Sequence, residues 1–540
     1  MGYRQKSSVQ EMLSDENWGG GPLRRSNSLK LLSIIFAFTL FAGACSGDND
    51  DSDSGIISDN SILGEDRPEQ SSDSTSGSEP VDNDDDHDQS DDDGHDHSGG
   101  EDHSDEVAGT AADSLNGDGA ELWESIVDGG TVVADNSLEP ILITLINIER
   151  ASQGSFPEIR EGIEAAVRTV NETMGGMNGR PVELESCVDG LDPNEAVACA
   201  NSVTDTRPQL HIQGIDFFNP LLWPTLTGAG LAIMQTVPIF VEDFNTPGII
   251  STEGGCASAF PSAMQYGVET LAADKYVILY SDTEPGLVCY EDTGERMLQQ
   301  LTDEGAIARE DWTGIPDVPG DPSDTDAVAQ QVLEFVDGSD NAWIYLGLQA
   351  SDCNEVLSSL SSKGYNGGVV ASGSCRDDSV TSNPASAGVH FGSSCCIPDR
   401  PDLWDPYTTK YNEWRNASID RYGPTAPKSN FMEVGHDVLI AGIIQMTRFI
   451  EAGGDIDNDP EGFSNFLATQ DNMNRPGIAI PLDCTTNNNE FISVCQKSSG
   501  YYIWSGPGGQ FEYGPLGEEL LDATDLILRA AESNPRSAVN

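Results

Sequence analysis

Apolar and polar residues alternate along the C-terminal part of the chain in a pattern that predicts strands followed by helices. The unbroken apolar run EPILITLINI (139–148) has the length of a buried strand. The next segment, 156–174, has apolar residues at helical spacing. The strand-then-helix order repeats at 179–187 and 192–205, where Asp192 precedes a proline and is expected to cap the second helix.

The same alternation continues to the C-terminal third of the chain. Strands of the buried type are predicted at 209–215, 231–241, 275–282, 341–348, 367–373 and 388–394, and helices at 326–337 and 353–364. Strands that alternate with helices favour parallel sheets in an α/β architecture, in which ligands bind at the carboxyl ends of the strands. No GxGxxG or P-loop pattern opens a helix, so the sequence gives no support for a dinucleotide or phosphate site.

The N-terminal region has a different pattern. A basic flank (24–30) precedes an apolar stretch (31–42) that is shorter than a membrane-spanning helix, which is the order found in export signals. The following AGAC (42–45) resembles the bacterial lipobox, in which the cysteine is diacylated. We therefore expect a lipoprotein signal region at 1–45 with lipidation at Cys45; an ordinary cleaved signal peptide is the alternative.

Residues 46–118 form an acidic, low-complexity segment. They contain 25 Asp or Glu residues against the single Arg67 and almost no aromatic residues. Such a segment buries too little apolar surface to offset the entropy of ordering, so we expect a disordered tether. The tether holds four of the seven histidines of the chain, and mixed His and Asp side chains either bind a divalent metal loosely or serve only solvation: His87, His95, His97 and His103.

Charge and cysteine content narrow the possible partners and the compartment. The net charge of −65 excludes nucleic acid as a partner. Besides Cys45 the chain has ten cysteines, and an even number in an exported chain predicts disulfide bonds. Sequence does not determine their connectivity. We expect neighbours to pair, as Cys187–Cys199, Cys256–Cys289, Cys353–Cys375 and Cys484–Cys495, while Cys395 and Cys396 either bond to each other or pair elsewhere.

Several segments together resemble one protein family. The run EGIEAAVRTVNETMGGMNGRPVELESCVDGLDPNEAVACANSV (161–203) resembles the opening of the type I solute-binding proteins, the branched-chain amino-acid receptors of ABC importers. The segments KYVILYSDTEPG (275–286), NFMEVGHDVLIAGIIQMTRFIEAGG (430–454) and SGYYIWSGPGGQFE (499–512) resemble later parts of the same family. The resemblance extends over about 138–530, which is nearly all of the region expected to fold.

The resemblance implies a periplasmic binding protein-like I fold in residues 119–540. That fold is α/β, with two lobes, each a mainly parallel sheet flanked by helices, joined by a hinge of three crossovers. The lobes are expected at about 138–255 with 398–480, and at about 256–397 with 481–530. A ligand is expected between them, at the strand ends.

The predicted strand ends and the family resemblance together indicate which residues line that cleft. The first lobe is expected to supply Ser155, Phe156, Asp216, Phe217, Phe218, Gln235 and Thr236, and the second Asp282, Glu284, Gln349, Ser374 and Asp377. Ser155, Thr236, Gln349 and Ser374 are the expected uncharged contacts, and Phe156 and Phe217 the apolar walls. Amino-acid receptors of the family carry an acidic residue near Ser374, which pairs with the ammonium group of the ligand. This chain has Arg376 there, which either faces an anionic ligand or is a solvated loop charge, so Asp282 or Asp377 is the expected ammonium partner.

These observations predict a monomeric, lipid-anchored, extracytoplasmic solute-binding protein. It is expected to deliver a small polar solute, amino acid or amide-like, to an ABC permease in the membrane, without cofactor or bound metal. A ligand-sensing receptor subunit of the same fold and a metal-binding lipoprotein that uses the tether are the alternatives. No GxSxG or HExxH pattern occurs, and the three histidines of the folded region lie in apolar strands or helices, so no enzyme is expected: His211, His390 and His436.

Overall fold

The computed structural model describes residues 132–151, 154–393, 406–423, 430–469, 484, 491–517 and 519–534. All of them belong to one compact unit of the chain, residues 101–540. The predicted signal region with Cys45, the predicted tether with its histidines, and the pair Cys395 and Cys396 lie outside the described residues. Within the described ranges, no helix is both long and apolar enough to cross a membrane.

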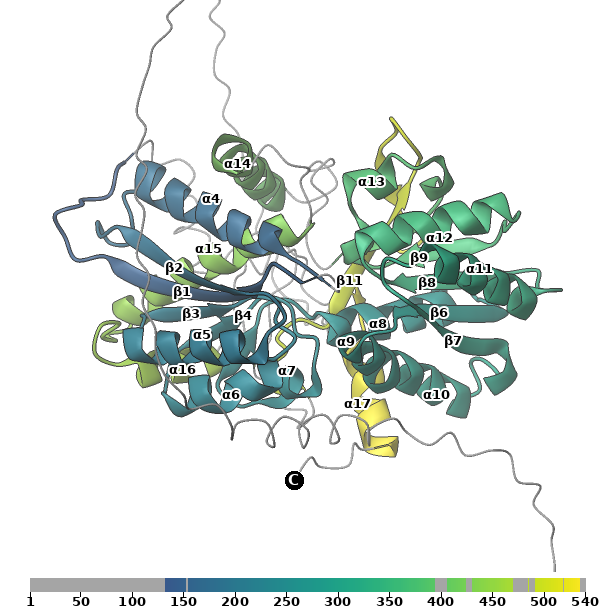
Figure 1. The fold of residues 1–540 in the computed structure, drawn as a ribbon, viewed down its shortest axis with the longest axis horizontal. Helices are drawn as coiled ribbons and strands as arrows, with labels where there is room; N and C mark the ends of the chain where they lie inside the picture. Colours follow the sequence, from purple (N-terminus) through teal and green to yellow (C-terminus); the bar gives the residue numbers. More distant parts are fainter. Residues whose placement is uncertain are drawn as a thin grey trace, which may run out of the picture. The chain divides into compact units, whose positions relative to one another are not determined.

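Five parallel strands form the first sheet, in the order β2-β1-β3-β4-β5 (Figure 1). Seven of the eight residues of the central strand β1 are buried, because helices cover both faces of the sheet. Side chains of β1 alternate between two cores: Ile143 and Leu145 face one, and Ile146 faces the other. The strands are β1 (Ile141–Ile148), β2 (Val182–Asp189), β3 (Leu210–Gln213), β4 (Ile233–Gln235) and β5 (Ile249–Ser251).

Helices cover both faces of this sheet, and we call the sheet with its helices lobe 1. α4 and α15 pack on one face, and α5 and α6 on the other. Asp192 caps α5, since its carboxylate accepts a hydrogen bond from the Asn194 N–H at 2.8 Å, as predicted. The helices are α4 (Pro157–Thr173), α5 (Pro193–Thr206), α6 (Asn219–Gly228), α7 (Val241–Asn245), α14 (Pro406–Tyr422), α15 (Asn430–Glu451) and α16 (Pro460–Ala468).

The second sheet has the order β12-β11-β10-β9-β8-β6-β7, with β13 paired to β11. Strands β6 to β10 are parallel, whereas β11 to β13 are antiparallel, and β11 and β12 form a hairpin near the C-terminal end of the described chain. The strands are β6 (Lys275–Ser281), β7 (Trp312–Asp317), β8 (Ala342–Gly347), β9 (Gly368–Ala371), β10 (His390–Ser393), β11 (Ser498–Trp504), β12 (Phe511–Tyr513) and β13 (Leu521–Asp522).

This sheet with its helices is lobe 2. Ile278 of β6 faces a core shared with α8 and α10, while Val277 and Leu279 face a core shared with α11 and α12. Helices therefore cover both faces of this sheet as well. They are α8 (Cys256–Gln265), α9 (Glu284–Val288), α10 (Arg296–Asp303), α11 (Pro322–Val336), α12 (Ala350–Ser362), α13 (Asp378–Thr381) and α17 (Thr524–Ser533).

The chain passes between the lobes three times. It leaves lobe 1 after β5, returns after β10 to form α14, α15 and α16, and enters lobe 2 again at β11. The first and third connections run side by side: the Ser251 N–H donates to the Ser493 carbonyl at 2.7 Å, and the Cys495 N–H donates to the Ser251 carbonyl at 3.2 Å. The prediction of two mainly parallel α/β halves is confirmed; the exact lobe boundaries stay a prediction.

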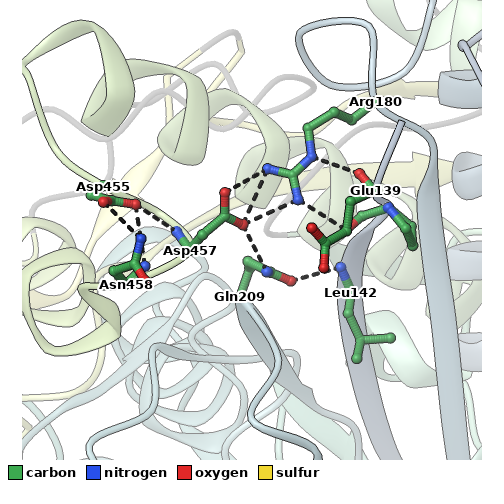
Figure 2. Close-up of polar contacts among 8 residues, drawn as sticks. Glu139, Leu142, Arg180, Gln209, Asp455, Asp457 and Asn458 are labelled. Atoms are coloured by element: carbon green, nitrogen blue, oxygen red, sulfur yellow. Dashed lines mark hydrogen bonds and ion pairs between the residues drawn. The ribbon is translucent and has the colours of Figure 1, made fainter. Parts of the chain in front are cut away.

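A polar cluster at the amino end of the first sheet joins the segment between α15 and α16 to the residues that precede β1, β2 and β3 (Figure 2). The Arg180 guanidinium donates to both oxygens of Asp457, at 2.8 and 3.1 Å, and to the Glu139 and Pro140 carbonyls. Gln209 donates to the same Asp457 carboxylate at 3.0 Å. This cluster stabilises the amino end of the sheet. It lies at the end opposite the carboxyl ends of the strands and therefore does not occupy the place where a ligand would bind.

Four disulfide bonds are present among the described residues, and they are the four pairs expected from the sequence. Cys187–Cys199 joins β2 to α5, and Cys256–Cys289 joins the start of α8 to the segment after α9. Cys353–Cys375 joins α12 to the turn after β9, and Cys484–Cys495 closes a loop before β11. Each of the four bonds closes a short stretch of chain, which limits the conformations of the unfolded state.

Candidate functional site

A cavity of about 210 Å³ is lined by residues of both lobes and of the segments that connect them. Its walls come from the carboxyl ends of β3 and β4 in lobe 1 and of β6, β8, β9 and β10 in lobe 2. This is the position at which α/β proteins with parallel sheets bind ligands. The cavity therefore lies where the strand-and-helix pattern predicts a binding site.

Side chains of lobe 1 make an apolar wall. Phe156 is at the centre of an aromatic group, with its ring 5.1 Å from the Phe431 ring and 6.5 Å from the Phe217 ring, both edge to face. Phe156 comes from the segment before α4, Phe217 follows β3, and Phe431 opens α15. The lobe 1 residues that line the cavity are Phe156, Ile215, Phe217, Val237, Ile239, Asn430, Phe431 and Val434.

Lobe 2 supplies most of the hydrogen-bonding side chains. Ser281 ends β6 and Thr283 follows it, Gln349 directly precedes α12, and Ser374 lies in the turn after β9. The Ser374 hydroxyl donates to the Leu348 carbonyl at 2.7 Å, which orients it. Aromatic residues complete this wall; Phe260 and Tyr345 meet edge to face at 5.0 Å. The two walls thus differ: the lobe 1 wall is apolar except for Asn430, and the lobe 2 wall carries most of the hydroxyl and amide groups.

Glu253 is the only charged side chain among the described residues that line the cavity. It lies in the first connection between the lobes, after β5 and before α8, and it is 3% exposed. Glu253 is not among the residues predicted from the sequence. In the sequence Glu253 stands before two glycines, between β5 and α8. No strand was predicted at 249–251, so no predicted strand end lies beside Glu253.

Four of the twelve residues predicted for the cleft line the cavity: Phe156, Phe217, Gln349 and Ser374. Gln235 and Thr236 are fully buried behind the wall, where Gln235 accepts from the Ser251 hydroxyl at 3.0 Å. Phe218 packs on the opposite side of the sheet, with the core of α5 and α6.

The five remaining predicted residues do not line the cavity either; one of them, Asp216, is fully buried beside Asp189. Ser155 is exposed, and its hydroxyl donates to the Glu149 carbonyl. Asp282 and Glu284 are exposed, on either side of Thr283, which faces the cavity. Asp377 caps α13 by accepting from the Ser379 N–H at 2.7 Å. None of these five residues lines the cavity, so the predicted ammonium partners are not in contact with it in this structure.

Arg376 has neither of the two roles considered from the sequence. It is 7% exposed and does not line the cavity. Its guanidinium donates to the Asn430 side chain at 2.6 Å and to Glu433 at 3.0 Å, so it joins lobe 2 to the start of α15. Arg415, fully buried, pairs with Glu433 at 3.5 Å and with Asp437 at 3.0 Å. This buried network holds the α15 wall of the cavity.

Burial shifts the pKa of several groups near the strand ends. Asp216 is buried beside the Asp189 carboxyl, and desolvation together with that like charge raises the pKa of Asp216 to about 8. Burial lowers the pKa of His211 to about 4, and the two ring nitrogens of His211 bond to Thr144 and Gln213 at 2.9 and 3.0 Å. His211 is therefore a hydrogen-bonded core residue, as predicted.

Within the part of the chain that the structure describes, no group of three or more His, Cys, Asp or Glu side chains is arranged to hold a metal ion. The cavity lining is also without a cysteine–histidine or serine–histidine pair, since it contains no histidine among the described residues. The arrangement suits reversible binding of a small molecule, because it combines aromatic surface with hydroxyl, amide and carboxylate groups.

Comparisons with known proteins agree with this geometry. Residues 151–445 match the protein family described as periplasmic binding protein. A comparison with curated proteins gives no match. A substrate-binding protein of an ABC transporter from Aeropyrum pernix is similar in structure, with a TM-score of 0.57 and 12% identity over 73% of this chain and 100% of that chain.

Two further solved structures are similar. The fatty acid ABC transporter substrate-binding protein from Thermomonospora curvata has a TM-score of 0.54 and 14% identity over 73% of this chain and 98% of that chain. A leucine-binding protein from Thermotoga maritima has a TM-score of 0.52 and 14% identity over 71% of this chain and 99% of that chain. At these identities the likeness shows the type I periplasmic binding fold and does not identify a ligand.

Proposed function

Because the chain belongs to the periplasmic binding protein family, we propose that it is the substrate-binding protein of an ABC importer. Proteins of this family bind small solutes outside the cytoplasm and deliver them to a permease. The observation that carries the proposal is the cavity at the strand ends, whose walls come from both lobes. A solute that contacts both walls stabilises the arrangement in which the lobes enclose it, and a permease can recognise that arrangement.

The difference between the two walls supports a solute with an apolar body and a polar head. Phe156, Phe217 and Phe431 offer aromatic surface, and Gln349 and Ser374 offer an amide and a hydroxyl. Burying a polar head costs free energy unless each of its groups is hydrogen-bonded, so lobe 2 selects the head and lobe 1 the body. Amino acids and their amides have this composition, and they are the solutes that we propose.

The lipid anchor on Cys45 and the monomeric state belong to the same proposal. A tether of the composition of 46–118 would let the folded region reach a permease while the lipid stays in the membrane. The variant Cys45→Ser should move the protein from the membrane fraction to the soluble fraction of the cell envelope. Membrane retention equal to that of the wild type would contradict the anchor.

Binding can be tested before the chemical identity of the solute is established. The full chain is incubated with a small-molecule extract of the source organism's growth medium, separated by rapid gel filtration, and the retained compounds are identified by mass spectrometry. We expect one compound, retained at one molecule per chain. Phe217→Ala should reduce its retention, because Phe217 lines the cavity, whereas the adjacent Phe218→Ala serves as the matched control because Phe218 packs in another core.

Two results would contradict the proposal. One is retention of no compound by the wild type, and the other is equal retention by wild type and Phe217→Ala. Chemical conversion of the retained compound would identify an enzyme instead. Deletion of the gene separates transport from sensing: loss of uptake of the compound supports a permease partner, while unchanged uptake with an altered cellular response supports a receptor.

A further inference from the structure

Glu253 is the feature of the cavity that the proposed function leaves unexplained. The other polar side chains of the described lining are uncharged hydroxyl and amide groups, and the lining contains no Lys, Arg or His. We propose that the Glu253 carboxylate binds the cationic group of the solute, so that the transported compound is an ammonium compound with an apolar body. The inference rests on the proposed function, because it assumes that the cavity holds the solute.

The backbone around Glu253 is held in a fixed position. A Cβ atom at Gly254 would lie 2.0 Å from the Ser258 Cβ and 2.6 Å from the Gln496 carbonyl oxygen. Gly255 has a φ of +49°, and a Cβ there would lie 2.1 Å from the Pro238 carbonyl oxygen. The two glycines therefore allow the first connection to pass tightly between α8, lobe 1 and the third connection, which fixes the backbone that carries Glu253 before a solute arrives.

The aromatic lining favours the same class of solute. Phe156, Phe217 and Phe431 line the cavity from lobe 1, and Phe260 and Tyr345 line it from lobe 2. The face of an aromatic ring attracts a cation, and the attraction is larger where water is excluded. A carboxylic acid without an ammonium group would bring a second carboxylate into the cavity that Glu253 lines, where two like charges repel. A cationic group instead pairs with the Glu253 carboxylate, and the aromatic side chains of the lining add the attraction of any ring face that meets it.

The other acidic residues near the strand ends do not compete for this role. Asp282 and Glu284 are exposed and are not part of the lining. Asp377 accepts the hydrogen bond that caps α13. The family resemblance places the ammonium partner near Ser374, in lobe 2, whereas Glu253 lies in the connection between the lobes. The geometry thus assigns charge selection to a different segment of the chain from the one that the resemblance implies.

Four probes with the same isobutyl body test the inference by isothermal titration calorimetry on the full chain. Leucine and 4-methylpentanoate differ only in the ammonium group, as do leucinamide and 4-methylpentanamide. We expect the ammonium group to raise the affinity about tenfold or more in both pairs, as a charge-assisted hydrogen bond would. In Glu253→Gln this factor should fall close to one in both pairs, while Glu253→Asp should keep part of it.

Glu334→Gln is the matched control, because Glu334 is exposed on α11 and is not among the described residues that line the cavity. In this variant the ammonium group should raise the affinity by the same factor as in the wild type. Thermal melts should show that all variants fold. Equal affinity of the wild type for both members of each pair, or an unchanged factor in Glu253→Gln, would overturn the inference. Absence of binding by both ammonium probes would also overturn it.

The inference and the proposed function fail separately. If the medium yields a captured compound that depends on Phe217 but carries no cationic group, the role of Glu253 is refuted and the solute-binding function stands. If the medium yields no compound at all, the proposed function itself is refuted. Capture of an ammonium compound whose affinity falls in Glu253→Gln supports both.

Discussion

The contact between α4 and α15 allows a sharp test of the packing that holds the apolar wall of the cavity. Gly162 lies inside α4, and a Cβ atom there would be 2.0 Å from the Met432 carbonyl oxygen of α15. The contact is reciprocal, because a Cβ at Gly435 of α15 would be 2.1 Å from the Ile159 carbonyl oxygen of α4. Both glycines let the two backbones touch, so Gly162→Ala must push the helices apart.

Two opposing effects set the expected magnitude. Alanine in a helix interior is favoured over glycine by about 1 kcal/mol. Against this, heavy atoms other than bonded neighbours almost never approach a Cβ closer than 3.0 Å, so α15 must retreat by about 1 Å along a seam of fully buried side chains. Overpacking of a dense core costs about 1–3 kcal/mol, and a contact between two backbones belongs at the upper end of that range. After the gain of about 1 kcal/mol from alanine is subtracted, we expect Gly162→Ala to lower the free energy of unfolding by about 2 kcal/mol.

Urea unfolding followed by tryptophan fluorescence measures this loss. Gly228→Ala is the control, because Gly228 ends α6 and a Cβ there would meet no atom within 4 Å. That control should leave the stability unchanged or raise it slightly. Affinity for the solute should fall in Gly162→Ala as well, since α15 carries Phe431 and Val434 of the cavity wall. A Gly162→Ala protein as stable as Gly228→Ala would refute the argument.

Two further predictions concern buried charge. Arg415→Met should lower the free energy of unfolding by about 3–5 kcal/mol, because Asp437 and Glu433 lose a partner in a buried site. Arg421→Met is the control: Arg421 is exposed, so its loss should lower the free energy of unfolding by less than about 1 kcal/mol. Equal losses in the two variants would contradict the stabilising role of the buried network. Asp216→Asn should become more stable relative to the wild type as pH rises from about 4 to 8, by up to about 1.4 kcal/mol per pH unit. The folded wild type has the Asp216 pKa raised to about 8, so it keeps a proton that the unfolded chain has lost; a difference independent of pH in chemical unfolding would refute this.

Most of the fold could be predicted from the sequence, because the strands and helices carry strong local patterns. The runs at 139–148 and 156–174 became β1 and α4 with shifts of one or two residues at their ends. The strand β7 was not predicted. Its sequence, WTGIPD, contains a glycine and a proline and lacks an apolar run, and it is a strand because it pairs with β6 along its whole length. Tertiary pairing of this kind is not visible in a local pattern.

The candidate site was predicted less well than the fold. The cavity does lie at the predicted strand ends, but several residues predicted there have side chains that do not line it, while their neighbours in the sequence do. At the end of β6, Ser281 and Thr283 line the cavity, while Asp282 and Glu284 are exposed. After β4, Val237 lines the cavity and Thr236 does not. Side chains alternate along extended chain, so a shift of one residue exchanges the two sets, and only the turn geometry decides which set faces inward.

Glu253 could not be predicted for a different reason. It lies in a connection between the lobes, and its position in the cavity depends on how the segments around 254–255 and 493–497 pack together. These segments are far apart in the sequence, so no local pattern joins them. The charged residue of the cavity is therefore visible only in the tertiary structure. Part of its apolar wall and of its hydroxyl and amide groups could be predicted from the sequence.

A crystal structure of the protein with the compound captured from the medium tests the central claim most directly. We predict density for one molecule in the cavity, in contact with Phe217 of lobe 1 and with Gln349 of lobe 2 at the same time. Density for the compound at another place on the protein, with solvent alone between Phe217 and Gln349, would contradict the claim that the two lobes bind the solute between them.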